Sequence, residues 1–102
     1  MITESDLIEL PQLLRDLFEG NLTNLQGCKS HILEFMFAGN AFIINDGYLC
    51  EEYYQRFKDE DGVYFEMKSA TSLPYFRKVY RIVRNEFLKY ESDLFLELHG
   101  DY

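Results

Sequence analysis

The segment 63–68 alternates strictly between two kinds of side chain, and no other feature of the chain limits its fold more. In order, the alternating residues are Val63, Tyr64, Phe65, Glu66, Met67 and Lys68. A period of two is typical of a half-buried strand, whose successive side chains point to opposite faces of a sheet. The sequence must therefore supply other strands for this one to pair with.

Two turn signals place such strands before it. Asp46-Gly47 predicts a two-residue hairpin turn, because both residues tolerate positive φ, and it joins strands at 41–45 and 48–57. The stretch 59–62, Asp-Glu-Asp-Gly, predicts the next turn. The three strands are therefore expected to form an antiparallel meander.

Two helices are expected before the meander. Leucines at helical spacing predict the first over 6–18, with Asp6 near its cap and with Pro11 either marking its true start or kinking its first turn. The second is expected over 24–38, where Leu25, Cys28, Ile32 and Met36 share one face. The stretch 32–37 also fits a buried strand, because short apolar runs are ambiguous.

A long helix and a final strand are expected after the meander. The helix covers 73–90, with Pro74 in its first turn, where a missing N–H is harmless. The segment 94–99 alternates again and predicts a strand, which a right-handed crossover would place parallel to the third strand of the meander. The predicted fold is one α+β or α/β domain over 1–102, in the order α-α-β-β-β-α-β.

This order resembles the N-terminal two-thirds of the GCN5-related N-acetyltransferase (GNAT) superfamily, in the form of a shortened phage-type member. The opening 2–18 resembles the first helix of many members, and 76–90 resembles the basic long helix of short phage-encoded ones. The resemblance implies acyl-CoA bound at the start of that helix, with Ser69, Thr71, Ser72 and Arg77 as candidates.

The family's glycine turn is missing at that point. Members hold the CoA pyrophosphate on an Arg/Gln-x-x-Gly-x-Gly/Ala turn, whereas 69–74 contains no glycine and Pro74 removes one N–H donor. The family's later strands, which carry its tyrosine acid, also have no counterpart. We therefore assign no catalytic residue and no cofactor, and an ordinary helix cap is the simpler explanation of the serines and threonine.

The charge balance of the chain makes some classes of binding partner less favourable than others. The chain has 10 basic and 18 acidic side chains, for a net charge of -8, which disfavours a protein that binds phosphate backbones. The excess lies in residues 1–51, which hold eight acidic and two basic side chains. Contact with nucleic acid is expected only through the helical residues Arg77, Lys78, Arg81 and Arg84, which can equally serve solubility or pair with the protein's own carboxylates.

The cysteines and histidines are the candidates for a metal site or a nucleophile. Cys28, His31, Cys50 and His99 formally make a zinc-binding set, but structural zinc ligands usually come as close pairs and only one pair is close here. A Cys28–His31 nucleophile has no stronger support, since a free cysteine mostly behaves as a small hydrophobe. No metal site is expected.

The remaining features favour protein binding. The candidate partner-binding residues are Glu51, Glu52, Tyr53, Tyr54, Asp59, Glu60, Asp61, Phe95, Glu97 and His99. The last three lie on a strand that would leave an unpaired sheet edge. We expect a non-catalytic acidic interaction module, and the inhibitor that we consider is one of a host or defence protein, encoded by a phage or mobile element. The alternatives are a minimal acyl-CoA-dependent N-acetyltransferase and a structural homodimer joined through the 94–99 edge.

A cytoplasmic location without membrane contact is also expected. The first residues lack the basic and apolar regions of a signal peptide. The apolar stretch 32–44 is interrupted by Glu34, Gly39 and Asn40, so it predicts no membrane-spanning helix. Two cysteines allow one disulfide at most, which is unlike a secreted disulfide framework.

Overall fold

The computed structural model describes residues 1–21 and 32–99. It shows an α+β fold with a four-stranded, wholly antiparallel sheet in the order β1-β2-β3-β4. The elements are α1 (Glu4–Asn21), β1 (Ile32–Phe37), β2 (Asn40–Asn45), β3 (Tyr48–Asp59), β4 (Gly62–Ser69), the short 3-10 helix η1 (Ala70–Ser72) and α2 (Phe76–His99). The predicted meander is confirmed and gains one strand at its start.

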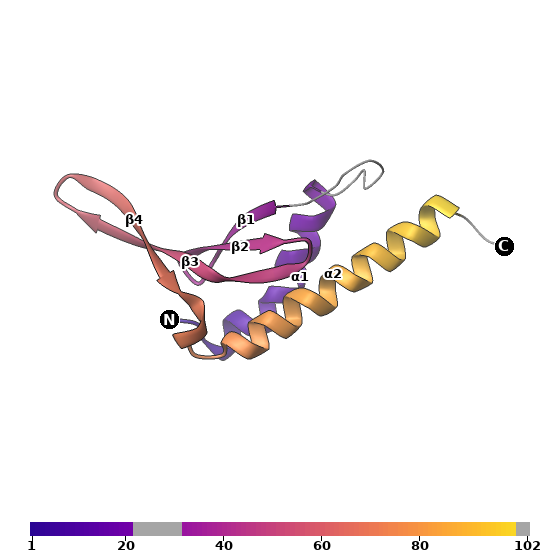
Figure 1. The fold of residues 1–102 in the computed structure, drawn as a ribbon, viewed down its shortest axis with the longest axis horizontal. Helices are drawn as coiled ribbons and strands as arrows, with labels where there is room; N and C mark the ends of the chain where they lie inside the picture. The colour runs from indigo at the N-terminus through magenta and orange to yellow at the C-terminus, as the bar shows by residue number, and fades with distance from the viewer. Residues whose placement is uncertain (22–31, 100–102) are drawn as a thin grey trace.

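The two helices lie against each other and cover one face of the sheet (Figure 1). Alternate residues of the first three strands point into the layer between sheet and helices, where α1 packs on β1 and α2 on β3. The buried side chains of that layer include Phe35, Phe42, Ile44, Leu49 and Tyr53 from the strands, Leu10, Leu14 and Phe18 from α1, and Val79, Val83 and Phe87 from α2. We call this covered side the inner face.

Helix α1 begins earlier than its leucine spacing predicts. Thr3 and Asp6 cap it reciprocally: the Thr3 N–H donates to Asp6 Oδ2 at 2.8 Å, and the Asp6 N–H donates to Thr3 Oγ1 at 3.2 Å. This is the hydrogen-bond pattern of a capping box. Pro11 therefore lies inside the helix, where it cannot donate to the carbonyl of Leu7.

The helix expected over 24–38 is wrong for its second half. Ile32–Phe37 is strand β1, and its buried residues Phe35 and Phe37 alternate with exposed ones. Ala38 and Gly39 both have positive φ, 51° and 79°, and make a tight hairpin turn into β2. Gly39 therefore lies in a hairpin turn and does not end a helix. The first part of the expected helix falls in 22–31, outside the described residues.

The final strand expected over 94–99 is also wrong, and with it the parallel pairing. Helix α2 continues without a break from Phe76 to His99. The stretch 91–93, which follows the expected end of the helix at residue 90, contains no glycine or proline, and the following leucines and glutamate favour a helix. The helix also begins at Phe76 and not at residue 73, so Pro74 precedes it.

Strand β4 departs from the half-buried strand that its alternation predicts. From Val63 to Ser69 every residue is exposed, because the helices cover β1 to β3 and leave β4 uncovered on both faces. The outer part of the β3–β4 hairpin, residues 56–65, extends away from the helices in Figure 1. We call this segment the arm. It contributes to an elongated shape with extents of 58 × 27 × 19 Å.

Candidate functional site

The face of the sheet opposite the helices carries a continuous apolar row. Met36 pairs with Ala41, Ala41 with Tyr54, and Tyr54 with Met67, so these four side chains lie side by side across all four strands. Ile32 on β1 and Phe65 and Val63 on β4 share the same face by register. The open face is defined here by Ile32, Met36, Tyr54, Val63, Phe65 and Met67.

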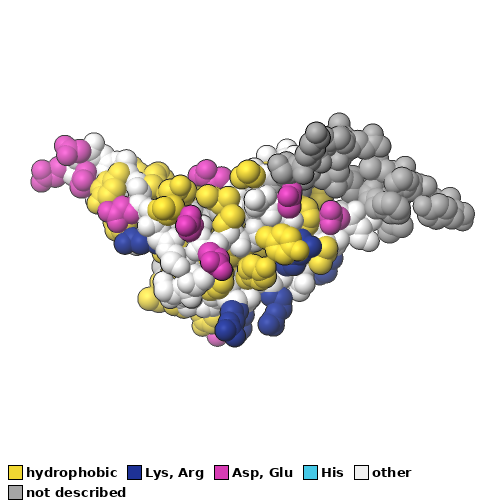
Figure 2. All heavy atoms as spheres, viewed as in Figure 1, with side chains coloured by type: hydrophobic (Ala, Val, Ile, Leu, Met, Phe, Trp, Pro, Cys, Tyr) yellow, Lys and Arg dark blue, Asp and Glu magenta, His cyan; other side chains and the backbone are white. Residues whose placement is uncertain are grey.

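These side chains are strongly exposed for their type. Met36 and Phe65 are each 49% exposed, and Met67 is 57% exposed. Figure 2 shows hydrophobic side chains at the surface over the strands. Scattered apolar residues are normal on a protein surface, whereas a contiguous group marks an interaction site.

Charged side chains border the row. By register, Glu34 and Glu52 lie on the open face on one side of the row, and Arg56 and Lys58 lie on the other. All four are exposed. An apolar centre with a charged border is the usual anatomy of a protein–protein interface.

A second surface lies on the first turns of α2. A hollow of about 440 Å³ is lined by Phe76, Arg77, Tyr80, Arg81, Arg84 and Asn85, which we call the basic groove. Helical spacing brings Arg77, Arg81 and Arg84 onto one side of the helix. The prediction of a basic helix face is therefore confirmed, and aromatic rings line it as well.

Arg84 and Lys78 each contact aromatic rings. The Arg84 guanidinium lies 4.0 Å from the centre of the Tyr48 ring and donates to the Asp46 carbonyl at 3.3 Å. Lys78 Nζ lies 5.4 Å from the centre of the Tyr75 ring. Arg84 is thus held against the β2–β3 turn, which orients one wall of the groove.

The acidic turn predicted at 59–62 forms the tip of the arm. Asp59, Glu60 and Asp61, which we call the acidic tip, are all exposed. The Asp61 N–H donates to Asp59 Oδ1 at 2.8 Å, which shapes the turn. In the part of the chain that the structure describes, none of the three carboxylates makes an ion pair.

The candidate CoA residues lie in the turn before α2 and bond to one another. Ser69 Oγ lies 2.7 Å from Thr71 Oγ1, and Ser72 Oγ donates to the Ser69 carbonyl at 3.0 Å. Leu73 to Tyr75 separate them from the helix start, and Arg77 lines the basic groove instead. The helix-start arrangement expected for a phosphate is therefore not formed by these residues.

The other partner-binding candidates are scattered. Glu51 and Glu52 are exposed on β3, and Tyr54 lies on the open face. Tyr53 belongs to the core, where its ring stacks on Phe42 at 5.1 Å. Phe95, Glu97 and His99 lie in the last turns of α2, so the sheet edge expected at 94–99, and a homodimer formed through it, have no structural basis.

The zinc candidates are placed only in part. Cys28 and His31 lie outside the described residues, and Cys50 is a partly buried free thiol on β3. Within the described chain, no three histidine, cysteine or acidic side chains are arranged so that they could hold a metal ion.

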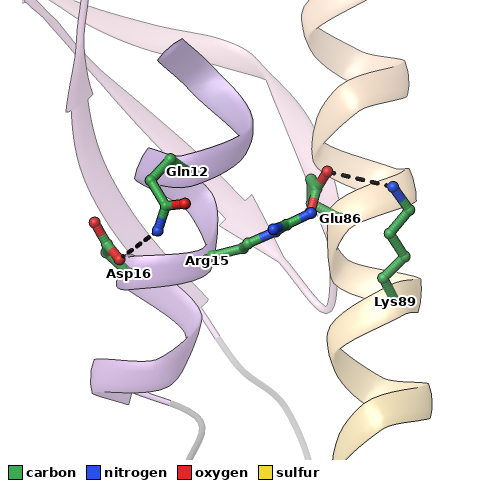
Figure 3. A network of polar contacts seen from close by, with 5 residues as sticks. All are labelled: Gln12, Arg15, Asp16, Glu86 and Lys89. Atoms are coloured by element: carbon green, nitrogen blue, oxygen red, sulfur yellow. Dashed lines mark hydrogen bonds and ion pairs between the residues drawn. The ribbon is translucent and has the colours of Figure 1, made fainter. Parts of the chain in front are cut away.

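Two features are not singled out by the sequence: Glu86, the most buried charged side chain in the described part of the chain, and most of the open face. Glu86 on α2 is bound by Arg15 of α1 at 3.1 Å and by Lys89 at 3.6 Å (Figure 3). Its spacing of three and seven residues from Val83 and Val79 places it beside the buried stripe of the helix, a signal that the sequence does contain. The sequence also contains a sign of the open face. In 63–68, the odd-numbered positions are all large apolar residues and the even-numbered positions include Tyr64, so neither face of the strand is wholly polar.

Comparison with protein-family models, with curated proteins and with solved structures finds no match to the chain. The resemblance to the acetyltransferase superfamily therefore remains a hypothesis. Across residues 1–21 and 32–99, no helix has the length and apolar character needed to cross a membrane.

Proposed function

We propose that this chain is a non-catalytic protein-interaction module that binds a protein partner on its open face. The row Met36–Ala41–Tyr54–Met67 carries the proposal, because it runs across all four strands and its three large side chains, Met36, Tyr54 and Met67, are exposed, while the small Ala41 between them is buried. A sheet normally buries an apolar face against another layer of structure. The two helices already form the layer that covers the inner face. The partner would form the corresponding layer over the open face.

The dimensions of the row suggest the kind of partner. Four strands about 4.8 Å apart make a row of roughly 15 Å, which is the length of about ten residues of α-helix. Methionine side chains adapt to different neighbours, and Met36 and Met67 stand near the two ends of the row. A partner that lays the apolar stripe of an amphipathic helix across the strands fits this surface best.

A role as an inhibitor of another protein is compatible with this mode of binding. A small domain that covers a partner's helix needs only a matching surface and no catalytic group. A host or defence protein as the partner is part of the proposal, and the small size and acidic charge of the chain support it only by analogy with small acidic inhibitors.

The proposal is tested by capture with paired variants. Wild-type protein and the double variant Met36→Lys/Met67→Lys are each used as bait, and the captured partner is then titrated by calorimetry. We expect the double variant to lose the partner, because it places two charges in the apolar row. The matched control is Ile8→Lys, which changes an 80% exposed apolar residue on α1 and should bind like wild type. Equal binding by the double variant would refute the proposal.

A further inference from the structure

The arm has little support from the rest of the molecule. Phe57 and Tyr64 stack at 5.4 Å across its two strands, and Lys68 Nζ lies 5.9 Å from the centre of the Phe57 ring. Its apolar residues Val63 and Phe65 are about half exposed. A two-stranded hairpin alone is only marginally stable in water, so a contact along the arm would stabilise it.

The first turns of α2, in and beside the basic groove, carry positive charges that form no ion pair with described residues of the same molecule. Among the described residues, Arg77, Lys78 and Arg81 make no ion pair, although the chain as a whole has eight more acidic than basic residues. Arg77 and Arg81 line the hollow together with the rings of Phe76 and Tyr80. The groove therefore fits an occupant that presents carboxylates beside apolar or aromatic side chains.

The chain itself contains a segment with that chemistry. The acidic tip presents three carboxylates, and Val63 and Tyr64 follow on β4 after Gly62. In Figure 1 the arm points away from α2, and in Figure 2 acidic side chains mark its outer end while basic ones lie along the lower edge of the molecule. The arm of one molecule is thus directed toward a neighbour and not toward its own groove.

We propose that two copies of this chain pair reciprocally, with the acidic tip of each in the basic groove of the other. A two-fold axis makes both contacts at once and closes the assembly at two copies. The acidic tip and the basic groove both lie outside the row Met36–Ala41–Tyr54–Met67, so the dimer leaves that row free for the protein partner.

The net negative charge of each copy opposes association at long range. The attraction between the acidic tip and the basic groove must be stronger than this repulsion. At about 0.1 M salt the Debye length is roughly 10 Å, so distant charges on two copies are largely screened while charges in contact are not. The arm supplies fewer residues than the 20–30 a side of a standard interface, so a dissociation constant of roughly micromolar size is expected. Salt near 1 M should dissociate the dimer.

Charge reversal tests the pairing directly. One variant reverses the tip with Glu60→Lys/Asp61→Lys, which keeps the Asp59 carboxylate that shapes the turn. The other reverses the groove with Arg77→Glu/Arg81→Glu. All four positions are exposed, and circular dichroism checks that both variants fold. Sedimentation equilibrium then gives the mass of each protein alone and of their equimolar mixture.

We expect wild type at about 100 μM to approach twice the chain mass of 12.2 kDa, and each variant alone to be a monomer, with affinity at least about 100-fold weaker. In the mixture both contacts regain opposite charges, so the dimer should return. A monomeric wild type, a dimer that survives either reversal, or a mixture that stays monomeric would each overturn the proposal.

Two further measurements separate this proposal from its rivals. Met67→Lys, which alters the open face, should leave the dimer intact, so loss of partner binding and loss of dimerisation are distinguishable. A fluorescent single-stranded oligonucleotide bound by wild type and lost with the groove variant would assign the groove to nucleic acid and overturn the dimer contact. No binding of the oligonucleotide is expected, given the net charge of -8.

Discussion

Arg15 and Glu86 stand 71 positions apart in the sequence, yet Arg15 Nε donates to Glu86 Oε2 over 3.1 Å. The Glu86 side chain is only 6% exposed, and Lys89 Nζ approaches its other oxygen at 3.6 Å (Figure 3). The contact joins α1 to α2 beneath the sheet. It therefore fixes how the helix that carries the basic groove lies against the rest of the molecule.

Removing Arg15 should destabilise the fold. Arg15→Ala leaves the buried Glu86 carboxylate with only the largely exposed Lys89, 3.6 Å away, and a buried charge that loses a partner is costly. Because Arg15 is itself about half exposed, we expect a loss of about 1–2 kcal/mol in the free energy of unfolding, measured in urea. Lys89→Ala is the control and should cost about 0.5 kcal/mol or less, since Lys89 is largely exposed. Equal costs for the two variants would contradict this account of the network.

Gly47 should tolerate no side chain. It has a φ of 83°, and a Cβ atom there would collide with the ring of Phe87 and approach Arg84. Gly47→Ala should therefore cost about 3 kcal/mol or more in unfolding free energy. The matched control is Gly39→Ala, which has a similar φ of 79° but nothing within 4 Å of the new methyl group, and should cost only about 1 kcal/mol. Similar costs at both glycines would show that the packing of the β2–β3 turn on α2 is not as described.

Substitutions on the two faces of the sheet should differ sharply in how much they destabilise the protein. Phe65→Thr on the open face replaces a half-exposed ring with a strand-favouring residue, so we expect the unfolding midpoint to change little. Phe42→Ala on the inner face removes a ring that is almost fully buried and should cost about 3–5 kcal/mol. Thermal or urea unfolding of both variants makes the comparison. A large loss with Phe65→Thr would mean that the open face is covered within the molecule.

The acetyltransferase hypothesis makes its own prediction. The hydroxyls of Ser69, Thr71 and Ser72 are engaged within their turn, and no glycine there admits a pyrophosphate close to the backbone. We therefore expect calorimetry with CoA to give no binding heat. Saturable heat that disappears with Arg77→Ala would support a cofactor site near η1 after all.

Local signals in the sequence predicted the centre of the fold well. The Asp46-Gly47 turn is confirmed, with φ of 51° and 83° at the two residues, and it joins β2 to β3 as expected. Alternation correctly predicted a strand at 63–68. These signals succeeded because turn conformation and strand period depend on neighbouring residues only.

Most of the errors arose where long-range contacts decide, and the exception is 94–99, where local helix propensity continues α2. The stretch 32–37 fits a helix or a strand by itself, and pairing with β2 makes it a strand. The stretch 94–99 alternates like a strand, but α2 simply continues through it. The exposure of β4 was also unpredictable from its own residues, because it depends on how far the two helices reach across the sheet.

Photo-crosslinking through methionine tests the central claim most directly. The chain has three methionines: Met36 and Met67 stand in the apolar row, while Met1, 90% exposed, lies outside it and serves as an internal control. Photo-methionine is incorporated in the cells that produce the protein, and the crosslinked peptides are mapped by mass spectrometry. We expect crosslinks from Met36 and Met67 to one helical segment of a partner protein. Crosslinks confined to Met1, or none at the two row positions while the partner is bound, would contradict the assignment of the open face as the binding surface.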